Sequence, residues 1–158
     1  MKTKKIDKIC VGASSGGHMT ELLGLLETVN MWPVKPSIYV TTREIWAKKL
    51  RALGKTYVVG ECNRNKPIMI LITGIRSLYF VLRERPDVII TTGSLPIAIV
   101  CLIARCFGSK IVWIDSVAQF EDLSMSGKLM LKYADLLLTQ WPEIAEKYPG
   151  VEYAGELQ

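Results

Sequence analysis

The sequence predicts an α/β fold: a Rossmann-like, mainly parallel sheet with helices on both faces. Short apolar runs rich in β-branched residues alternate with longer helical patterns from one end of the chain to the other. The first apolar run leads into a loop of Gly and Ser and then into a helix, an order typical of α/β folds that bind phosphate. The chain has 158 residues, of which 49% are hydrophobic, enough for one domain with a buried core. We therefore expect a single domain over residues 1–158.

Three strands and three helices are expected in the first half of the chain. Pro33 and Pro36 mark the connection after the first helix, and Gly54 ends the second helix. Pro67 fits the first position of the third helix, after a polar loop. The expected order is strand 6–11, helix 18–29, strand 37–40, helix 41–53, strand 56–59 and helix 68–83.

The second half continues the alternation with four strands and three helices. Pro96 and Pro142 suit helix starts, Gly108 suits a helix end, and Ser126 suits an N-cap. The β-branched run at 88–91 is typical of a buried parallel strand. The expected order is strand 88–91, helix 96–107, strand 110–114, helix 126–134, strand 136–139, helix 142–148 and strand 151–154.

Small and polar residues follow several of these strands directly. In a parallel α/β sheet, ligands bind outside the carboxyl ends of the strands, and these loops meet at that edge. The opposite edge carries no comparable set of residues. The candidate phosphate- or substrate-binding residues are Ser14, Ser15, Gly16, Gly17, Gly93, Ser94, Ser116 and Gln140.

The glycine loop at residues 12–17 matches neither of two common nucleotide-binding motifs. It has the glycine spacing of a Walker A loop, but His18 and Met19 stand where Lys and Ser or Thr would hold phosphate and Mg²⁺. Its glycines also do not fit the dinucleotide pattern G-x-G-x-x-G. A phosphate cradle and a tight turn without a ligand both remain open. His18 is accordingly a residue bonded to a neighbouring loop, a phosphate donor or a general base.

Asp115 follows the fifth strand, opposite the glycine loop. It suits either a cap of the loop after that strand or a general base, and the residues alone leave both roles open. His18 and Asp115 are thus the two candidate catalytic residues. The four cysteines form no CxxC pair and the chain has one His, so we expect no structural zinc site and a reduced, cytoplasmic protein.

The charge of the chain favours anionic partners. The 20 Lys and Arg against 15 Asp and Glu leave a net charge of +5, which suits phosphates, acidic lipid head groups or nucleic acid. The Lys-rich start at residues 2–8 is followed by a short apolar run at 9–11 only, so we expect no export signal.

The helix expected at 68–83 is apolar nearly all round and has basic residues near both ends. A buried core helix is one interpretation. The other is a helix on a membrane surface, which pairs apolar side chains with cations that meet anionic lipid. About 15 apolar-dominated residues are short for a membrane span, which needs roughly 20. The candidate membrane contacts are Ile68, Ile72, Ile75, Arg76, Tyr79, Phe80 and Arg83.

Six motifs resemble one protein family, in the same order along the chain. They are Gly-Ala-Ser-Ser-Gly-Gly-His at 12–18, Thr-Gly-Ser at 92–94, Trp-Ile-Asp-Ser at 113–116, Leu-Ser-Met-Ser-Gly-Lys-Leu at 123–129, Tyr-Ala-Asp at 133–135 and Gln-Trp-Pro at 140–142. Over essentially its whole length the chain resembles the PssD/CpsF-like subunits of bacterial exopolysaccharide and capsule biosynthesis. These are related to the eukaryotic membrane-anchoring subunit of the dolichol-linked UDP-GlcNAc transferase.

The resemblance implies the acceptor-side, N-terminal half of a GT-B glycosyltransferase divided between two polypeptides, similar to MurG-type enzymes. A separate small subunit would supply most of the UDP-sugar site. The pair would transfer a sugar from a UDP-sugar to a polyprenyl-diphosphate-linked acceptor, with this chain bound peripherally at the cytoplasmic face of the cell membrane. The alternative is a non-catalytic adaptor that recruits a separate catalytic subunit.

The resemblance also suggests roles for the candidate residues. The amides of residues 14–17 and His18 would bind a diphosphate, either of the lipid or of UDP, and Asp115 or His18 would be the base. Eukaryotic relatives resemble Ile-Glu-Ser where this chain has Ile-Asp-Ser. Because no DxD-like carboxylate pair is present, we expect no metal, and we expect no cofactor and no nucleic-acid partner.

Overall fold

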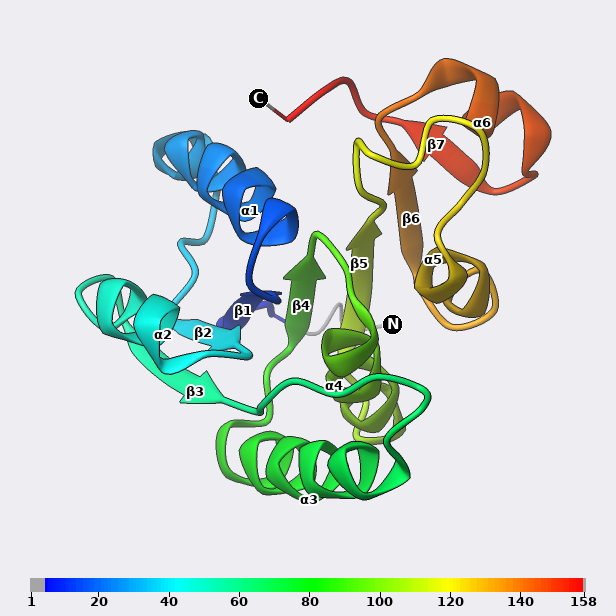
Figure 1. Ribbon diagram of the computed structural model, residues 1–158. Coiled ribbons are helices and arrows are strands. Elements are labelled where there is room, and N and C mark those ends of the chain that lie inside the picture. Colours follow the sequence, from blue (N-terminus) through cyan, green and yellow to red (C-terminus); the bar gives the residue numbers. More distant parts are fainter. Residues whose placement is uncertain (1–4, 158) are drawn as a thin grey trace.

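Seven parallel strands form one sheet in the computed structural model, which describes residues 5–157 (Figure 1). Their order across the sheet is β3-β2-β1-β4-β5-β6-β7, and every neighbouring pair is parallel. The fold class expected from the alternating pattern is therefore confirmed. The strands are β1 (Ile9–Ala13), β2 (Ile38–Thr41), β3 (Lys55–Val58), β4 (Val88–Thr91), β5 (Lys110–Ile114), β6 (Leu136–Thr139) and β7 (Val151–Tyr153).

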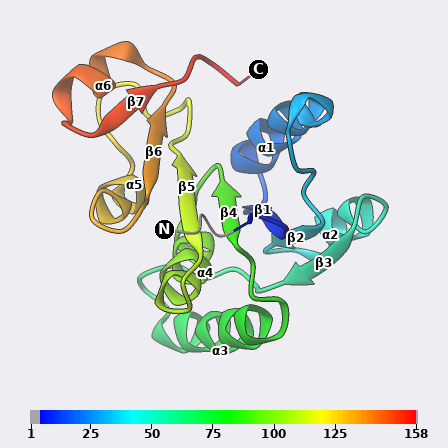
Figure 2. The same ribbon diagram turned by 180° about the vertical axis from the view of Figure 1, so that it is seen from behind.

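Helices connect consecutive strands and cover both faces of the sheet (Figures 1 and 2). The chain steps outward from β1 to β3 and then returns to β4 and continues to β7. Because parallel crossovers share one hand, this reversal puts the later helices on the opposite face from the earlier ones. The helices are α1 (Gly17–Glu27), α2 (Glu44–Leu50), α3 (Pro67–Glu84), α4 (Leu95–Cys106), α5 (Met125–Met130) and α6 (Pro142–Lys147), with a 3₁₀ turn, η1 (Val29–Met31).

Two apolar clusters form the core, one on each face of the sheet. Along β1, Cys10 packs into the cluster beneath α3 and α4, whereas Val11 packs into the cluster beneath α1. Successive side chains of a strand point to opposite faces, so a strand buried on both faces has a continuous apolar sequence. This burial explains why central strands such as β1 and β4 lack an alternating polar pattern.

All of the expected helices and strands are present, and their ends differ from the expected ones by a few residues. The largest differences are in β1, which begins at Ile9, in α5, which ends at Met130, and in α2, which spans Glu44–Leu50 and is three residues shorter than expected at each end. The register explains the first difference, since β1 pairs with β2 from Cys10 to Ala13. The N-cap of α5 is Ser124 and not Ser126. Part of the Lys-rich start, residues 2–4, lies outside the described residues.

Candidate functional site

The reversal of strand order lies between β1 and β4, and the loops that follow these two strands meet there. A cavity of about 840 Å³ opens beside them. Its wall also includes the β3–α3 loop and the first turns of α3, α4 and α5. The lining residues are Ser14, Glu61, Cys62, Asn63, Arg64, Lys66, Met69, Ser94, Leu95, Pro96, Met125, Ser126 and Leu129.

The glycine loop presents exposed backbone at the start of α1. Gly16 is the N-cap residue and has φ +87°, a conformation that favours glycine. A Cβ built on Gly16 or Gly17 would meet no heavy atom within 4 Å, so open space lies beside both residues. The first amides of a helix have no acceptor within the helix, and the helix dipole makes this end favourable for an anion. The loop is therefore suited to hold a phosphate group.

His18 joins the glycine loop to the β4–α4 loop. Its Nδ1 lies 2.8 Å from the carbonyl oxygen of Thr92, and the Thr92 hydroxyl donates to the His18 carbonyl at 2.6 Å. Because a carbonyl oxygen can only accept, Nδ1 carries the proton of the neutral ring and Nε2 keeps a free lone pair. The half-buried imidazole is thus fixed in the tautomer in which Nε2 can accept a proton.

The β4–α4 loop passes close to this ring. A Cβ on Gly93 would lie 3.4 Å from His18 Cε1 and 3.3 Å from Trp113 Cζ2, and Gly93 has φ +108°. Ser94 has φ 100° and ψ 155°, a region that is almost restricted to glycine. Its hydroxyl oxygen is buried and has no hydrogen-bond partner within the described chain. Ser94 therefore combines backbone strain with an unused polar group at the start of α4.

Asp115 lies at the carboxyl end of β5, but its carboxylate is used within the protein. The residue is 2% exposed, and it accepts hydrogen bonds from Ser124 N at 2.7 Å, Ser124 Oγ at 2.6 Å and Trp113 Nε1 at 3.2 Å. A Cβ on Gly127 would lie 2.7 Å from Asp115 Oδ1, so α5 packs directly on the carboxylate. This geometry does not fit the expectation that Asp115 is a general base. Asp115 instead anchors Ser124, which caps α5 by accepting from Gly127 N.

Ser116 and Gln140 are also buried and bonded within the protein, contrary to the expectation that they face a ligand. The Ser116 hydroxyl donates to Glu21 Oε1 at 2.8 Å. The Gln140 amide donates to the Asp115 carbonyl at 3.0 Å and accepts from Leu157 N at 2.7 Å. Both side chains fasten the end of β5 to neighbouring segments.

Glu21 is a buried carboxylate that sequence reasoning missed. It is 4% exposed, and its Oε1 accepts from Ser116 Oγ and, at 3.0 Å, from Val117 N. It ties α1 to the β5–α5 loop. A signal was present in the sequence, since Glu21 interrupts the apolar face formed by Met19, Leu22 and Leu26.

A second carboxylate missed by sequence reasoning, Glu61, lies directly on the glycine loop. The Ser15 hydroxyl donates to Glu61 Oε1 at 2.5 Å. Arg43 holds both carboxylate oxygens, with Nε to Oε1 at 2.7 Å and Nη2 to Oε2 at 2.8 Å. The hydrogen bonds from Arg43 and then Ser15 lower the pKa of Glu61 below its ordinary value. Glu61 follows Gly60 in a polar loop, where no sequence pattern marked it.

The helix α3 exposes apolar side chains and buries polar ones, which is the reverse of an ordinary surface helix. Its outward face is apolar: Ile68 is 73% exposed, Ile75 61% and Tyr79 58%. Its inward face includes the polar residues Thr73, Ser77 and Glu84. Ile72 is half-buried, whereas Arg76 and Arg83 are exposed. The outward apolar side chains, which we call the α3 stripe, are those of Ile68, Leu71, Ile72, Ile75, Leu78, Tyr79 and Leu82.

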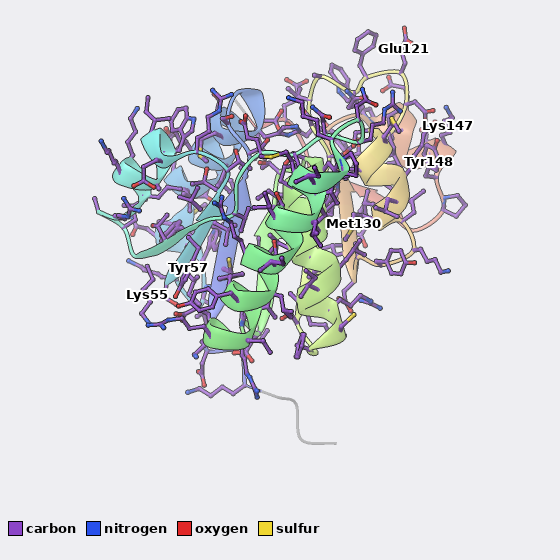
Figure 3. All side chains as sticks on the ribbon, turned by 60° about the horizontal axis from the view of Figure 1, so that its bottom comes forward. Lys55, Tyr57, Glu121, Met130, Lys147 and Tyr148 are labelled. Carbon is purple, nitrogen blue, oxygen red and sulfur yellow. The ribbon has the colours of Figure 1, made fainter. Side chains whose placement is uncertain are left out.

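Phe80 does not belong to the outer face of α3, and the prediction of it as a membrane contact is wrong. It is fully buried and packs on Tyr57, with ring centroids 5.0 Å apart. Tyr57 donates to Glu84, and Lys55 Nζ lies 3.5 Å from the same carboxylate. Figure 3 shows Lys55 and Tyr57 beside this end of α3. These contacts fix the rotation of α3 about its axis.

Within residues 5–157, no helix combines the length and the apolarity that crossing a bilayer requires. In the same residues, His, Cys, Asp and Glu side chains form no group of three or more arranged to hold a metal ion.

Comparison with known proteins identifies the family. A family model described as "Oligosaccharide biosynthesis protein Alg14 like" matches residues 43–157. The chain is 27% identical over 174 residues to the UDP-N-acetylglucosamine transferase subunit ALG14 of Yarrowia lipolytica, with 95% of this chain and 81% of that protein covered. It is 28% identical over 177 residues to the human protein of the same name, with 94% and 82% covered.

Solved structures show the fold. The crystal structure of Acinetobacter baumannii MurG matches with a TM-score of 0.74 at 15% identity, over 96% of this chain and 47% of MurG. The UDP-N-acetylglucosamine 2-epimerase of Rickettsia bellii matches with a TM-score of 0.69 at 14% identity, over 96% of this chain and 45% of the epimerase. The chain thus spans about half the length of each and has the fold of one half of such an enzyme. Since the family model covers well over half of its residues, the chain belongs to the Alg14-like family of oligosaccharide biosynthesis proteins.

Proposed function

We propose that this chain is the acceptor-side, membrane-associated subunit of a two-component glycosyltransferase. The pair would transfer a sugar from a UDP-sugar to a polyprenyl-diphosphate-linked acceptor, as in exopolysaccharide or capsule biosynthesis. The names of the relatives, which are subunits of a UDP-N-acetylglucosamine transferase, support the reaction class. The match to about half of MurG supports a partner that supplies the other half of the enzyme, namely the small UDP-sugar-binding subunit. We propose that residues 1–158 are one Rossmann-like domain that supplies the acceptor side.

The observation that carries a catalytic role is the fixed imidazole of His18. An acceptor hydroxyl must lose a proton as UDP departs, and a positioned base accelerates that step. Nε2 of His18 takes the proton, while Nδ1 stays bonded to the Thr92 carbonyl, which stabilises the imidazolium. The amides of Gly16 and Gly17, the hydroxyls of Ser14 and Ser15, and the Gly93–Ser94 loop hold a diphosphate beside it.

Asp115, Ser116 and Gln140 take a different part in this proposal. Their polar groups hold the end of β5, Glu21 and the cap of α5 in place. They act as positioning residues for the wall of the cavity and touch no substrate. Asp115 is accordingly not the proposed base.

The α3 stripe is the proposed membrane contact, at the cytoplasmic face of the cell membrane. Arg76 and Arg83 are exposed on the same helix, and Arg64 and Lys66 precede it. Apolar side chains that enter the head-group region, with cations beside them, bind anionic membranes. Met69 and Lys66 also line the cavity, so the proposed contact adjoins the site that would receive a lipid-linked acceptor.

A transfer assay with the co-expressed partner subunit tests the catalytic role. Replacing the base should lower kcat by about 10² while the acceptor KM changes little. We therefore expect this loss for both His18→Ala and His18→Gln. Thr20→Ala, on the exposed side of the same helix, is the matched control and should retain wild-type turnover.

A non-catalytic adaptor that recruits a separate catalytic subunit is the second candidate. The structural use of Asp115, Ser116 and Gln140 favours it, because three of the expected site residues have no free polar group. Full turnover of the His18→Ala complex would support the adaptor and contradict the catalytic proposal. A panel of UDP-sugars in the same assay identifies the donor.

A further inference from the structure

The carboxylate of Glu61 contacts one side of the glycine loop at Ser15. Glu61 lines the cavity together with Ser14 and Ser94, and its Oε1 accepts the hydroxyl of Ser15 at 2.5 Å. The backbone amide of Ser15 is also used, since it donates to the Thr42 hydroxyl at 3.2 Å. The loop proposed to bind a diphosphate therefore already holds a negatively charged group through one of its serines.

The contacts of Glu61 are those that a phosphate group would make. A hydroxyl and a forked guanidinium both bind carboxylate and phosphate oxygens by charge-assisted hydrogen bonds. Arg43 presents Nε and Nη2 to the two oxygens of Glu61 at 2.7 and 2.8 Å. The same fork would fit two oxygens of a phosphate bound at the glycine loop.

The Arg43–Glu61 pair is placed so that it can exchange partners. The Arg43 side chain is 60% exposed and the Glu61 side chain 42%, and ion pairs in contact with water are weak. Glu61 belongs to the segment between β3 and α3, which contains no helix or strand up to Pro67. Arg43, by contrast, directly precedes α2, which Leu50 anchors in the core. Glu61 can therefore move away without disturbing an element, whereas the backbone of Arg43 stays fixed.

We propose that Arg43 is a further phosphate-binding residue of this site and that Glu61 is its placeholder. Without ligand, Glu61 holds Arg43 and the Ser15 hydroxyl in position. When a diphosphate binds, it takes over both donors and the Glu61 carboxylate leaves, because two anions cannot share them. This inference rests on the proposed function of the glycine loop as a diphosphate site.

The experiment is calorimetric titration of the full chain with inorganic pyrophosphate, UDP and farnesyl diphosphate. The phosphate chemistry is shared by the three probes, whereas added affinity for UDP or for farnesyl diphosphate indicates the donor or the lipid as the source. Glu61→Gln removes the competing charge and should tighten binding about twofold to fivefold, in line with the modest strength of exposed pairs. Glu44→Gln is the matched control, because Glu44 also forms an exposed ion pair with an arginine, Arg51, and its replacement should leave affinity unchanged.

A double-mutant cycle separates the two roles of Arg43. If Arg43 binds the phosphate, Arg43→Gln weakens binding in the wild type and also in the Glu61→Gln chain. If Arg43 only holds Glu61, Arg43→Gln has no effect once Glu61 is replaced, and the inference is overturned. Unchanged affinity in Glu61→Gln overturns the placeholder role.

A third variant distinguishes this inference from the proposed function on which it rests. Gly17→Ala places a methyl group in the open space beside the loop. It should weaken the binding of all three probes if the loop holds the diphosphate. Binding that responds to Gly17→Ala but not to Glu61→Gln would leave the glycine-loop site standing and remove the placeholder. Absence of binding to the wild type and to Glu61→Gln, or binding indifferent to Gly17→Ala, would overturn both.

Discussion

Ser94 is the residue at which strain and an unused polar group coincide. Such strain persists mainly where function requires it, and a non-glycine residue in this region costs about 1–3 kcal/mol. We expect Ser94→Gly to raise the free energy of unfolding by about 1 kcal/mol, after allowing for the greater flexibility of glycine in the unfolded chain. Urea unfolding measures it, and pyrophosphate affinity should fall at the same time.

The control for this prediction lies on the same cavity wall. Ser126 is within the regular helix α5, where glycine should destabilise by about 0.5–1 kcal/mol. A loss of stability in Ser94→Gly similar to that in Ser126→Gly would contradict the assignment of strain to Ser94.

Asp115 leads to a prediction about stability instead of chemistry. In Asp115→Asn, an amide group would replace one of two oxygens that accept hydrogen bonds from Ser124. An unsatisfied buried donor costs about 1–3 kcal/mol, so the free energy of unfolding should fall by about that amount. Glu121, which Figure 3 shows at the outer tip of the same loop, is the control: Glu121→Gln should change stability by less than about 0.5 kcal/mol. A large loss of turnover without loss of stability would contradict the structural role.

The contrast between His18 and Asp115 shows what the sequence could and could not predict at this scale. Both residues were expected at the carboxyl edge of the sheet, because strand ends and the loops after them are visible in the pattern. Two of the three donors to the Asp115 carboxylate come from Ser124, nine residues further on, across a loop whose path no local pattern fixes. Glu61 was missed for a related reason, since the position of its loop over the glycine loop depends on how β3 and α3 pack.

The α3 stripe leads to a prediction at the scale of one element. We expect Leu71→Glu plus Ile75→Glu to abolish flotation of the chain with anionic liposomes, because two charges would enter the head-group boundary. Both side chains are more than 60% exposed, so folding should be little affected. Higher salt should weaken the binding of the wild type, since the cations of α3 contribute to it.

Phe80→Ala is the contrasting variant on the same helix. Removal of its buried ring should lower the free energy of unfolding by about 3–5 kcal/mol, as for other aromatic side chains in a core. Thermal unfolding measures this loss. Unchanged flotation of the Leu71→Glu plus Ile75→Glu chain would contradict a membrane role for α3.

The length and limits of α3 were predictable, but its orientation was not. Pro67 at its start and the segment at 85–87 at its end are local signals. Which side faces the core depends on contacts with distant segments, such as that of Phe80 with Tyr57, and Thr73 and Ser77 lie on the same buried side. The helix is apolar nearly all round, so its only periodic signal is the spacing of these polar residues. That signal misleads, because polar residues usually face solvent and these two are buried.

At the scale of the whole molecule, buried or paired carboxylates join elements that are distant in sequence. The hydrogen bond from Tyr57 lowers the pKa of Glu84, and hydrogen bonds from Lys128 and then Tyr148 lower the pKa of Asp122. Figure 3 shows Lys147 and Tyr148 beneath the loop that carries Glu121, the neighbour of Asp122. These contacts join β3 to α3 and the β5–α5 loop to α6.

The shifted pKa values predict how stability depends on pH. A carboxylate whose pKa is lower in the folded chain stabilises it above the unfolded pKa and loses that effect as pH falls through the folded value. Stability should therefore decline below about pH 4.5, the ordinary value for Glu. Glu84→Gln should flatten this decline, whereas the exposed Glu152→Gln should not. An identical pH dependence of urea unfolding in all three chains would contradict the role of Glu84.

The fold as a whole was predictable because the signals that define its helices and strands lie within short stretches of sequence. Each strand is a short apolar run, each helix has a Pro or Gly signal near an end, and strict alternation leaves few parallel topologies. The order β3-β2-β1-β4-β5-β6-β7 is the tertiary result that brings the loops after β1 and β4 together. Side-chain partners across those loops depend on ångström-scale packing, which the pattern of residues does not contain.

Given the proposed membrane contact, the position of α3 beside the cavity has a consequence for the rate at which the acceptor arrives. The helix has 18 residues and is about 27 Å long, and Met69 near its first turn belongs to the cavity wall. A chain lying on this helix would hold the cavity mouth at the bilayer surface with a fixed tilt. A lipid-linked acceptor would then arrive by lateral diffusion in two dimensions, and its density per unit area of membrane, instead of its bulk concentration, would govern the rate.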